Sequence, residues 1–144
     1  MQWCSHQKNV HGILMPDING SRKIMNIKTK EIFDIECVDA ENTSERLTPI
    51  GKYNFYTAVF EKANRIITDS LAQHPEWLII DEAGKLELDG KGFYDSILKT
   101  AEVYKDNNLD SHLLIAVRDN FCEEVISFFK IADVKVIHQL EELI

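Results

Sequence analysis

The sequence lacks any apolar run close to the length of about 20 residues that a helix needs to span a bilayer. Its opening segment, Met1–Lys8, also lacks the apolar stretch of a secretory signal peptide. Both absences favour the cytoplasm, and we expect a protein without a membrane partner.

Cysteine and histidine are scarce and widely spaced. The three cysteines form no CxxC pair, which argues against a zinc ribbon and a disulfide framework. No two histidines stand four residues apart, and no HExxH pattern occurs. The sequence therefore predicts no metal site built from these side chains, which are Cys4, Cys37, Cys122, His6, His11, His74, His112 and His138.

Basic residues are fewer than acidic ones. The chain has 16 Lys and Arg against 24 Asp and Glu, which gives a formal net charge of −8. The longest basic cluster is the short segment Lys28–Lys30. An acidic chain without a basic patch repels phosphate backbones, so we expect no nucleic-acid partner. A small anionic ligand remains compatible with this charge, since a few N–H groups and one lysine suffice to hold it.

Glycine is also sparse, and this has the strongest consequence. No two of the six glycines stand five residues apart, so the phosphate-binding pattern GxxxxGK[ST] is absent from these 144 residues. The Gly-Lys pairs that begin at Gly51, Gly84 and Gly90 are each followed by a residue other than Ser or Thr. The sequence as given therefore contains no Walker-A loop.

The part of the chain from Val10 to about Val38 has the pattern of strands and turns. Short apolar segments alternate with turn residues such as Asn19-Gly20, which predicts a β-meander or a pair of hairpins. The acidic segment Asp39–Glu45 is expected to be an exposed loop. The strands predicted here lie within 11–15, 23–27 and 31–35.

From residue 50 onward, amphipathic helices alternate with strands that are apolar throughout. This alternation predicts a parallel sheet covered by helices. The fold class is therefore α/β, a mostly parallel sheet flanked by helices with a small antiparallel insert near the N-terminus. We expect one domain, 1–144, with the insert at 10–38 and the α/β part at 50–144. The predicted elements are helices at 54–73, 93–104, 120–129 and 139–144, and strands at Trp77–Ile80, Leu113–Val117 and Val134–Ile137.

The most informative segment is Trp77–Ile80 followed by Asp81 and Glu82. Four apolar residues followed by two acids form a Walker-B pattern. A buried parallel strand delivers its carboxyl end to the crevice where open α/β sheets bind ligands. There an Asp can hold Mg²⁺ through water, and the next acid can polarise an attacking water molecule. Many strands also end in acids that only contact solvent or cap a helix.

The longer stretch Asp81–Leu88 resembles the signature of a nucleoside-triphosphatase family first described in thermophiles and related to a human cancer-related nucleoside-triphosphatase. Gly12–Leu14 and Arg22–Ile27 are similar to the β insert of that family, and Ile50–Tyr53 is similar to its Gly-Lys-Tyr turn. The resemblance implies a P-loop fold and Mg²⁺-dependent hydrolysis of nucleoside triphosphates such as ATP. It assigns the metal to Asp81 and the catalytic role to Glu82.

Two basic residues are candidates for binding the nucleotide. Lys85 follows the acidic pair closely enough to reach a phosphate, although a lysine at such a turn is commonly solvated. Arg118 follows a predicted strand at the ligand-binding edge, and arginine neutralises phosphate well. The alternative for Arg118 is a salt bridge to Asp119 or to a nearby carboxylate. Glu87 is expected to stabilise the loop rather than to take part in chemistry.

The missing phosphate loop is the main departure from the family. Met1–Lys8 resembles the helix that follows this loop, and a truncated gene, a misplaced start codon and a degenerate paralogue would all give this sequence. We expect the chain alone to be inactive, with Mg²⁺ and nucleoside triphosphate as ligands only if a P-loop is supplied. The alternative is a non-catalytic interaction module. The resemblance places the loop-bearing strand between Leu113–Val117 and Val134–Ile137, so we expect these edges to pair again or to form a homodimer.

Overall fold

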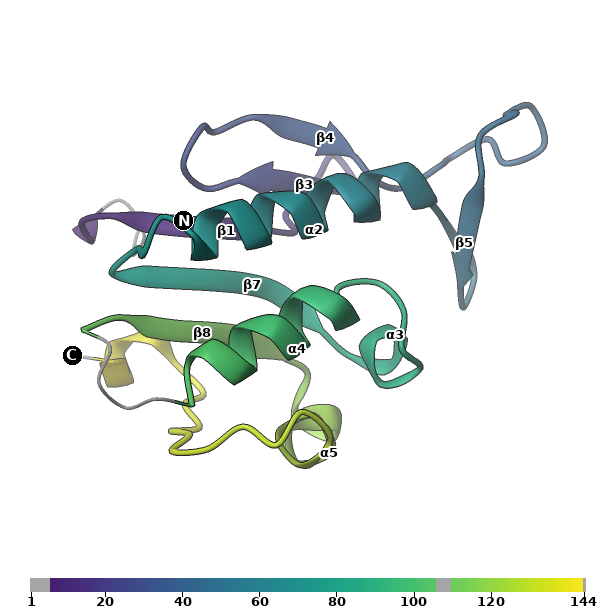
Figure 1. The fold of residues 1–144 in the computed structure, drawn as a ribbon. Helices are drawn as coiled ribbons and strands as arrows, with labels where there is room; N and C mark the ends of the chain where they lie inside the picture. Colours follow the sequence, from purple (N-terminus) through teal and green to yellow (C-terminus); the bar gives the residue numbers. More distant parts are fainter. Residues whose placement is uncertain (1–5, 106–109, 144) are drawn as a thin grey trace.

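The computed structural model describes residues 6–105 and 110–143, and one mixed sheet forms the centre of the fold (Figure 1). The strands of this sheet follow the order β2–β3–β1–β7–β8, and β4 also pairs with β3, outside this order. Their bounds are β1 Val10–Leu14, β2 Asp17–Ile18, β3 Ser21–Asn26, β4 Ile32–Asp34, β7 Trp77–Ala83 and β8 His112–Val117. A separate hairpin consists of β5 Leu47–Ile50 and β6 Tyr53–Tyr56.

Helices fill the connections between the later strands. The α-helices are α2 Thr57–Leu71, α3 Lys85–Leu88, α4 Tyr94–Val103 and α5 Cys122–Phe128, with short 3-10 helices at Asp119–Phe121 and Leu140–Leu143. None of the helices in the described ranges is both long and apolar enough to cross a membrane. The Met1–Lys8 helix predicted from the sequence lies largely outside the described residues.

Three parallel strands form the part of the sheet that positions the site. β1 pairs in parallel with β7 from Val10↔Trp77, and β7 pairs in parallel with β8 from Trp77↔His112. The predicted fold class and the parallel pairing of Trp77–Ile80 with Leu113–Val117 are therefore confirmed. Because these strands run in the same direction, their carboxyl ends meet at one edge of the sheet.

The prediction for the first strand needs a correction. β1 pairs antiparallel with β3, as a meander requires, but its other edge pairs in parallel with β7. Gly12 permits this close pairing, since it adopts φ +111° and a Cβ placed there would lie 1.9 Å from the Ile79 carbonyl oxygen. The antiparallel strands β2, β3 and β4 thus extend the parallel sheet, and β1 joins the two parts.

The prediction of a third strand at Val134–Ile137 is wrong. This segment has no regular secondary structure, and Val134 and Val136 are 48% and 47% exposed. β8 is the last strand of the described sheet, so no neighbouring strand supplies hydrogen bonds to the segment. Apolar β-branched residues alone do not make a strand without a partner.

The helix predicted at 54–73 begins later than expected. Tyr53–Tyr56 pairs with Leu47–Ile50 around the Gly51-Lys52 turn, so α2 begins at Thr57. The helices predicted at 93–104 and 120–129 are present as α4 and as α5 with its preceding 3-10 turn. Of the helix predicted at 139–144, the described residues 139–143 contain only the short 3-10 helix Leu140–Leu143.

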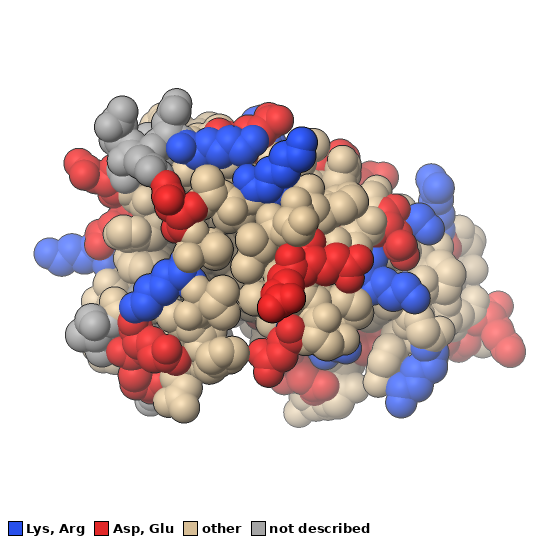
Figure 2. All heavy atoms as spheres, turned by 90° about the horizontal axis from the view of Figure 1, so that it is seen from below, with Lys and Arg blue, Asp and Glu red and all other residues tan. Residues whose placement is uncertain are grey.

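Charged side chains of both signs are present on the face shown in Figure 2. On the face shown in Figure 2, Lys and Arg lie separately among Asp and Glu and form no continuous basic area. This face gives no support to a nucleic-acid interface, and the absence of a nucleic-acid partner stays a prediction.

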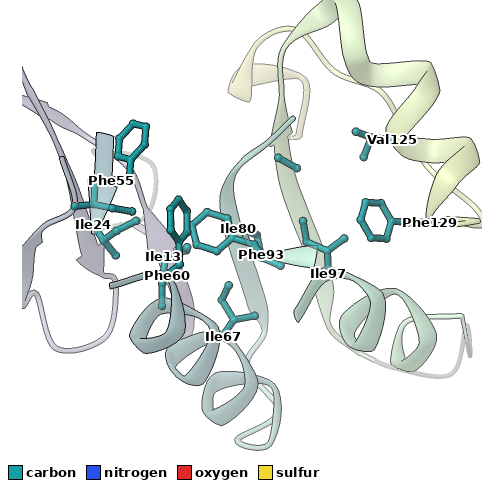
Figure 3. Packing of buried hydrophobic residues seen from close by; sticks show 13 residues of the cluster. Ile13, Ile24, Phe55, Phe60, Ile67, Ile80, Phe93, Ile97, Val125 and Phe129 are labelled. Atoms are coloured by element: carbon teal, nitrogen blue, oxygen red, sulfur yellow. The ribbon is translucent and has the colours of Figure 1, made fainter. Parts of the chain in front are cut away.

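The core lies between the sheet and the helices α2 and α4 (Figure 3). Ile13 and Ile80 of the parallel strands are fully buried, and Ile67 of α2 and Ile97 of α4 are equally inaccessible. The two helices are also joined by a polar contact, because Ser96 of α4 donates to the Asn64 backbone carbonyl of α2 at 3.3 Å. This packing holds β7 rigidly at the centre of the sheet, so the residues at its carboxyl end have a fixed support.

Candidate functional site

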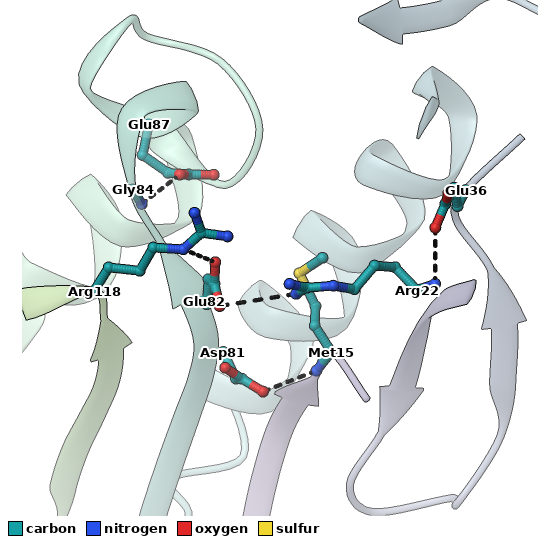
Figure 4. Close-up of polar contacts among 8 residues, drawn as sticks. All are labelled: Met15, Arg22, Glu36, Asp81, Glu82, Gly84, Glu87 and Arg118. Carbon is teal, nitrogen blue, oxygen red and sulfur yellow. Dashed lines mark hydrogen bonds and ion pairs between the residues drawn. The ribbon is translucent and has the colours of Figure 1, made fainter. Parts of the chain in front are cut away.

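Asp81 and Glu82 lie at the carboxyl end of β7, where the register with β8 is irregular between Asp81 and Ala83. The strand is longer than predicted and includes both acids. Asp81 accepts a hydrogen bond from the backbone N–H of Met15 at 3.0 Å, and Met15 directly follows β1 (Figure 4). The hydrogen bond orients this carboxylate between the ends of two parallel strands.

The surroundings of Asp81 are poorly suited to a lone negative charge. Burial raises the pKa of Asp81 above its ordinary value, the Met15 N–H and Arg22 oppose that rise, and neighbouring Glu82 adds to it. A cation beside this carboxylate would relieve the cost of its ionisation.

The donor set near Asp81 fits magnesium better than a metal held by protein alone. The described residues contain no group of three or more His, Cys, Asp or Glu side chains placed to hold a metal. Mg²⁺ in phosphate-transfer sites uses one or two carboxylates and completes its shell with water and substrate phosphates. Asp81 supplies one such carboxylate at the end of the strand, so the residues present fit the metal implied by the family resemblance.

Glu82 lies between two arginines that come from opposite sides of the site (Figure 4). Arg118, just after β8, donates from Nε to Glu82 Oε1 at 3.1 Å. Arg22 on β3 places Nη1 3.8 Å from Glu82 Oε2, and its backbone N–H donates to Glu36 at 3.0 Å. The structure thus places Arg118 beside the acidic pair. Its salt bridge is to Glu82, the alternative of a nearby carboxylate, and not to Asp119.

Arg22 and Met15 were missed by reasoning from the sequence. Both lie in the N-terminal strand region, more than 55 residues before Asp81. The available signal was that Arg22 falls in a stretch similar to the β insert of the family. That similarity indicated the element, but it did not indicate which side chain faces the site.

Glu87 fixes the loop that follows β7. Its buried carboxylate accepts the N–H of Gly84 at 2.8 Å and the N–H of Phe93 at 3.0 Å. Gly92, at φ +61°, leaves room for this group, because a Cβ there would lie 2.3 Å from Glu87 Oε1. Glu87 therefore stabilises the loop, as expected from the sequence.

Lys85 is not brought together with the other candidates. It is exposed at the start of α3, and its side chain makes no hydrogen bond or ion pair with the residues that the structure describes. Its assignment to nucleotide binding stays a prediction.

The arrangement at the end of β7 can be compared with known proteins. A family model described as NTPase matches residues 2–138, which is nearly the whole chain. The chain belongs to this NTPase family. The family resemblance predicted from Asp81–Leu88 is thereby confirmed.

A solved structure supports the same placement at the level of the fold. The crystal structure of THEP1 from the hyperthermophile Aquifex aeolicus matches with a TM-score of 0.63 and 15% sequence identity. The match covers 88% of this chain and 72% of that chain. A comparison with curated proteins finds no match. At this identity the THEP1 likeness establishes the fold of this NTPase-family chain, and the roles of its residues need separate arguments.

Proposed function

We propose that this chain carries the metal- and water-binding half of a nucleoside-triphosphate hydrolysis site. The observation that carries the proposal is the position of Asp81 and Glu82 at the carboxyl end of the central parallel strand. Asp81, oriented by the Met15 N–H, holds Mg²⁺ through water. Glu82 orients or deprotonates the attacking water molecule.

Each part of this site has a distinct physical task. Bound Mg²⁺ neutralises charge on the phosphates. Burial of Asp81 fixes the direction of its carboxylate. The side chain of Glu82 is 31% exposed and can therefore contact water. Arg118 is placed to offset negative charge that the substrate brings. Lys85 is assigned to nucleotide binding on its proximity in sequence alone.

The 144-residue chain by itself is expected to be inactive. Phosphoryl transfer depends on positioning and charge neutralisation, which in this superfamily come largely from the glycine-rich loop and its lysine. At a distance of ~4 Å and an effective dielectric constant near 20, each uncompensated pair of like charges costs about 4 kcal/mol. Asp81 and Glu82 bring two negative charges that Arg22 and Arg118 only balance, so without that loop these four side chains have no surplus of positive charge to hold a triphosphate.

The measurement is phosphate release by this chain with Mg²⁺ and ATP or GTP, compared with the same chain carrying Glu82→Gln. We expect no release above the rate without protein in either case. Turnover that disappears in the Gln variant would show that another part of this sequence replaces the loop.

A second candidate function is a non-catalytic interaction module that keeps the fold. The observation in its favour is that Glu82 is already paired with Arg22 and Arg118. The reading frame upstream of the Met1 codon separates the two candidates. An in-frame strand followed by a glycine-rich Lys-Ser/Thr loop favours hydrolysis, and the extended chain should then release phosphate in a manner that Glu82→Gln abolishes.

A further inference from the structure

The Glu82 carboxylate is enclosed by positive charge in a way that the Walker-B pattern does not require. Each of its two oxygens faces a different guanidinium, Arg118 Nε at 3.1 Å and Arg22 Nη1 at 3.8 Å. The two arginines come from separate elements, one from β3 and one from the segment after β8. The carboxylate thus bridges two cations across the carboxyl end of β7.

Both arginines keep donors that no protein group uses within residues 6–105 and 110–143. The 3.8 Å contact of Arg22 is longer than a hydrogen bond, and its guanidinium makes no hydrogen bond with residues in the described ranges. To the residues that the structure describes, Arg118 donates only from Nε, so its two terminal nitrogens have no hydrogen-bond acceptor among them. Guanidinium groups with open donors are suited to bidentate contacts with phosphate oxygens.

The contacts with Glu82 are also easy to exchange. The side chains of Arg22, Arg118 and Glu82 are 34%, 62% and 31% exposed. Ion pairs with this much exposure to water contribute little to stability, because solvent screens them. An incoming oxyanion that carries more charge than one carboxylate can therefore displace Glu82 from the arginines.

We propose that Arg22 and Arg118 form a binding site for a phosphate group, and that the Glu82 carboxylate occupies this site when no phosphate is bound. The ligand class is a phosphate oxyanion, and its assignment to a nucleoside triphosphate rests on the proposed function. When the phosphate takes over the two guanidinium groups, Glu82 is released toward water. The same exchange then binds the substrate charge and frees the group that acts on the nucleophile.

The test is to remove the competing carboxylate. Glu82→Gln keeps the size of the side chain and removes its charge, so inorganic pyrophosphate, titrated calorimetrically without metal, should bind at least about tenfold more tightly than to the unchanged chain. The gain should be lost in Glu82→Gln/Arg22→Gln and in Glu82→Gln/Arg118→Gln. Circular dichroism and thermal unfolding establish that each variant is folded.

Two controls match the change in net charge. Glu61→Gln removes an exposed carboxylate on α2, and Glu82→Gln/Arg65→Gln removes an exposed arginine on the same helix. The first should leave pyrophosphate affinity unchanged, and the second should keep the gain. A similar gain in Glu61→Gln, no gain in Glu82→Gln, or a gain that survives the loss of Arg22 would overturn the proposal.

A second titration, with ATP or GTP, distinguishes the source of the phosphate. If ATP or GTP binds Glu82→Gln at least as tightly as pyrophosphate does, and with the same dependence on both arginines, the site accepts the phosphate chain of a nucleotide. Binding of pyrophosphate with exclusion of both nucleotides would overturn the assignment to a nucleoside triphosphate. Failure of an extended chain to hydrolyse nucleotide would contradict the proposed function and leave the arginine-dependent binding in place.

Discussion

At the scale of single residues, the buried carboxylate of Glu87 supports the loop beside the site. Its two oxygens accept the N–H groups of Gly84 and Phe93. In Glu87→Gln one oxygen remains to accept, while the new NH₂ group faces the second N–H donor. We expect this variant to lose about 1–3 kcal/mol of unfolding free energy, measured by urea denaturation at pH 7. Glu102→Gln, at an exposed position on α4, should stay close to the unchanged chain.

The pH dependence of this loss follows from the direction of the pKa shift. Burial raises the pKa of Glu87 above 4.5, and the backbone N–H groups of Phe93 and Gly84 only partly oppose it. The folded state therefore holds this proton more strongly than the unfolded state. The contribution of Glu87 to stability is largest below the unfolded pKa and falls as pH rises through the folded pKa. The gap between the unchanged chain and Glu87→Gln should narrow from pH 4 to pH 7, and a gap that widens would contradict this assignment.

The residues of the site differ in how far the sequence could reveal them. Asp81 and Glu82 were predictable because a local signal, four apolar residues before two acids, places them at the end of a buried strand. Met15 and Arg22 were not, because their contacts with that pair depend on how distant strands align. A hydrogen bond across 66 residues leaves no mark in local spacing.

At the scale of elements, the close pairing of β1 with β7 depends on Gly12. A methyl group at this position would lie 1.9 Å from the Ile79 carbonyl oxygen, and the backbone adopts φ +111°. We expect Gly12→Ala to destabilise the chain by more than about 3 kcal/mol, because the strands must separate or the backbone must strain. Denaturant unfolding followed by circular dichroism measures this loss.

Gly20→Ala is the matched control for this substitution. Gly20 also has a positive φ, +78°, but a Cβ placed there would meet no described atom within 4 Å beyond its chain neighbours. Only the backbone preference should then count, at about 1–2 kcal/mol. Equal losses in the two variants would mean that strand contact at Gly12 is unimportant.

The elements that the sequence predicted well are those with a clear apolar pattern. α4 has apolar residues at helical spacing, and β7 and β8 contain runs that are apolar throughout. Val134–Ile137 has the composition of a strand, yet it lacks a partner in the described sheet. Tyr53–Tyr56 continues the apolar pattern of α2, and its pairing with Leu47–Ile50 overrides that local preference. Partner availability, which a single sequence does not show, decided both cases.

At the scale of the whole molecule, β8 leaves one edge of the sheet unpaired in the described structure. A groove of about 900 Å³ runs beside it, lined by β8 and by the segment that includes Val134 and Val136. An apolar edge strand of this kind invites pairing with another chain. We expect the chain to form a homodimer through this edge, which light scattering over a range of concentrations can measure.

A charge on the edge strand should disrupt such a dimer. Leu114→Lys adds a lysine to β8, and Leu98→Lys adds the same charge to the partly exposed face of α4. The first should give a monomer, and the second should leave the dimer intact. A chain that is monomeric at every concentration would contradict the expectation.

The order of the strands also sets when the site can exist. Of these residues, Met15 and Arg22 are synthesised first, Asp81 and Glu82 follow after all of α2 has been made, and Arg118 comes about 100 residues after Met15. At about 5–20 residues per second, the groups that meet at the end of β7 are synthesised over roughly 5–20 s. Until β7 has been made, the early strand β1 has only its antiparallel neighbour β3 to pair with. The edge of β1 that pairs with β7 therefore stays open to the described strands until the strand that carries the acids has been made.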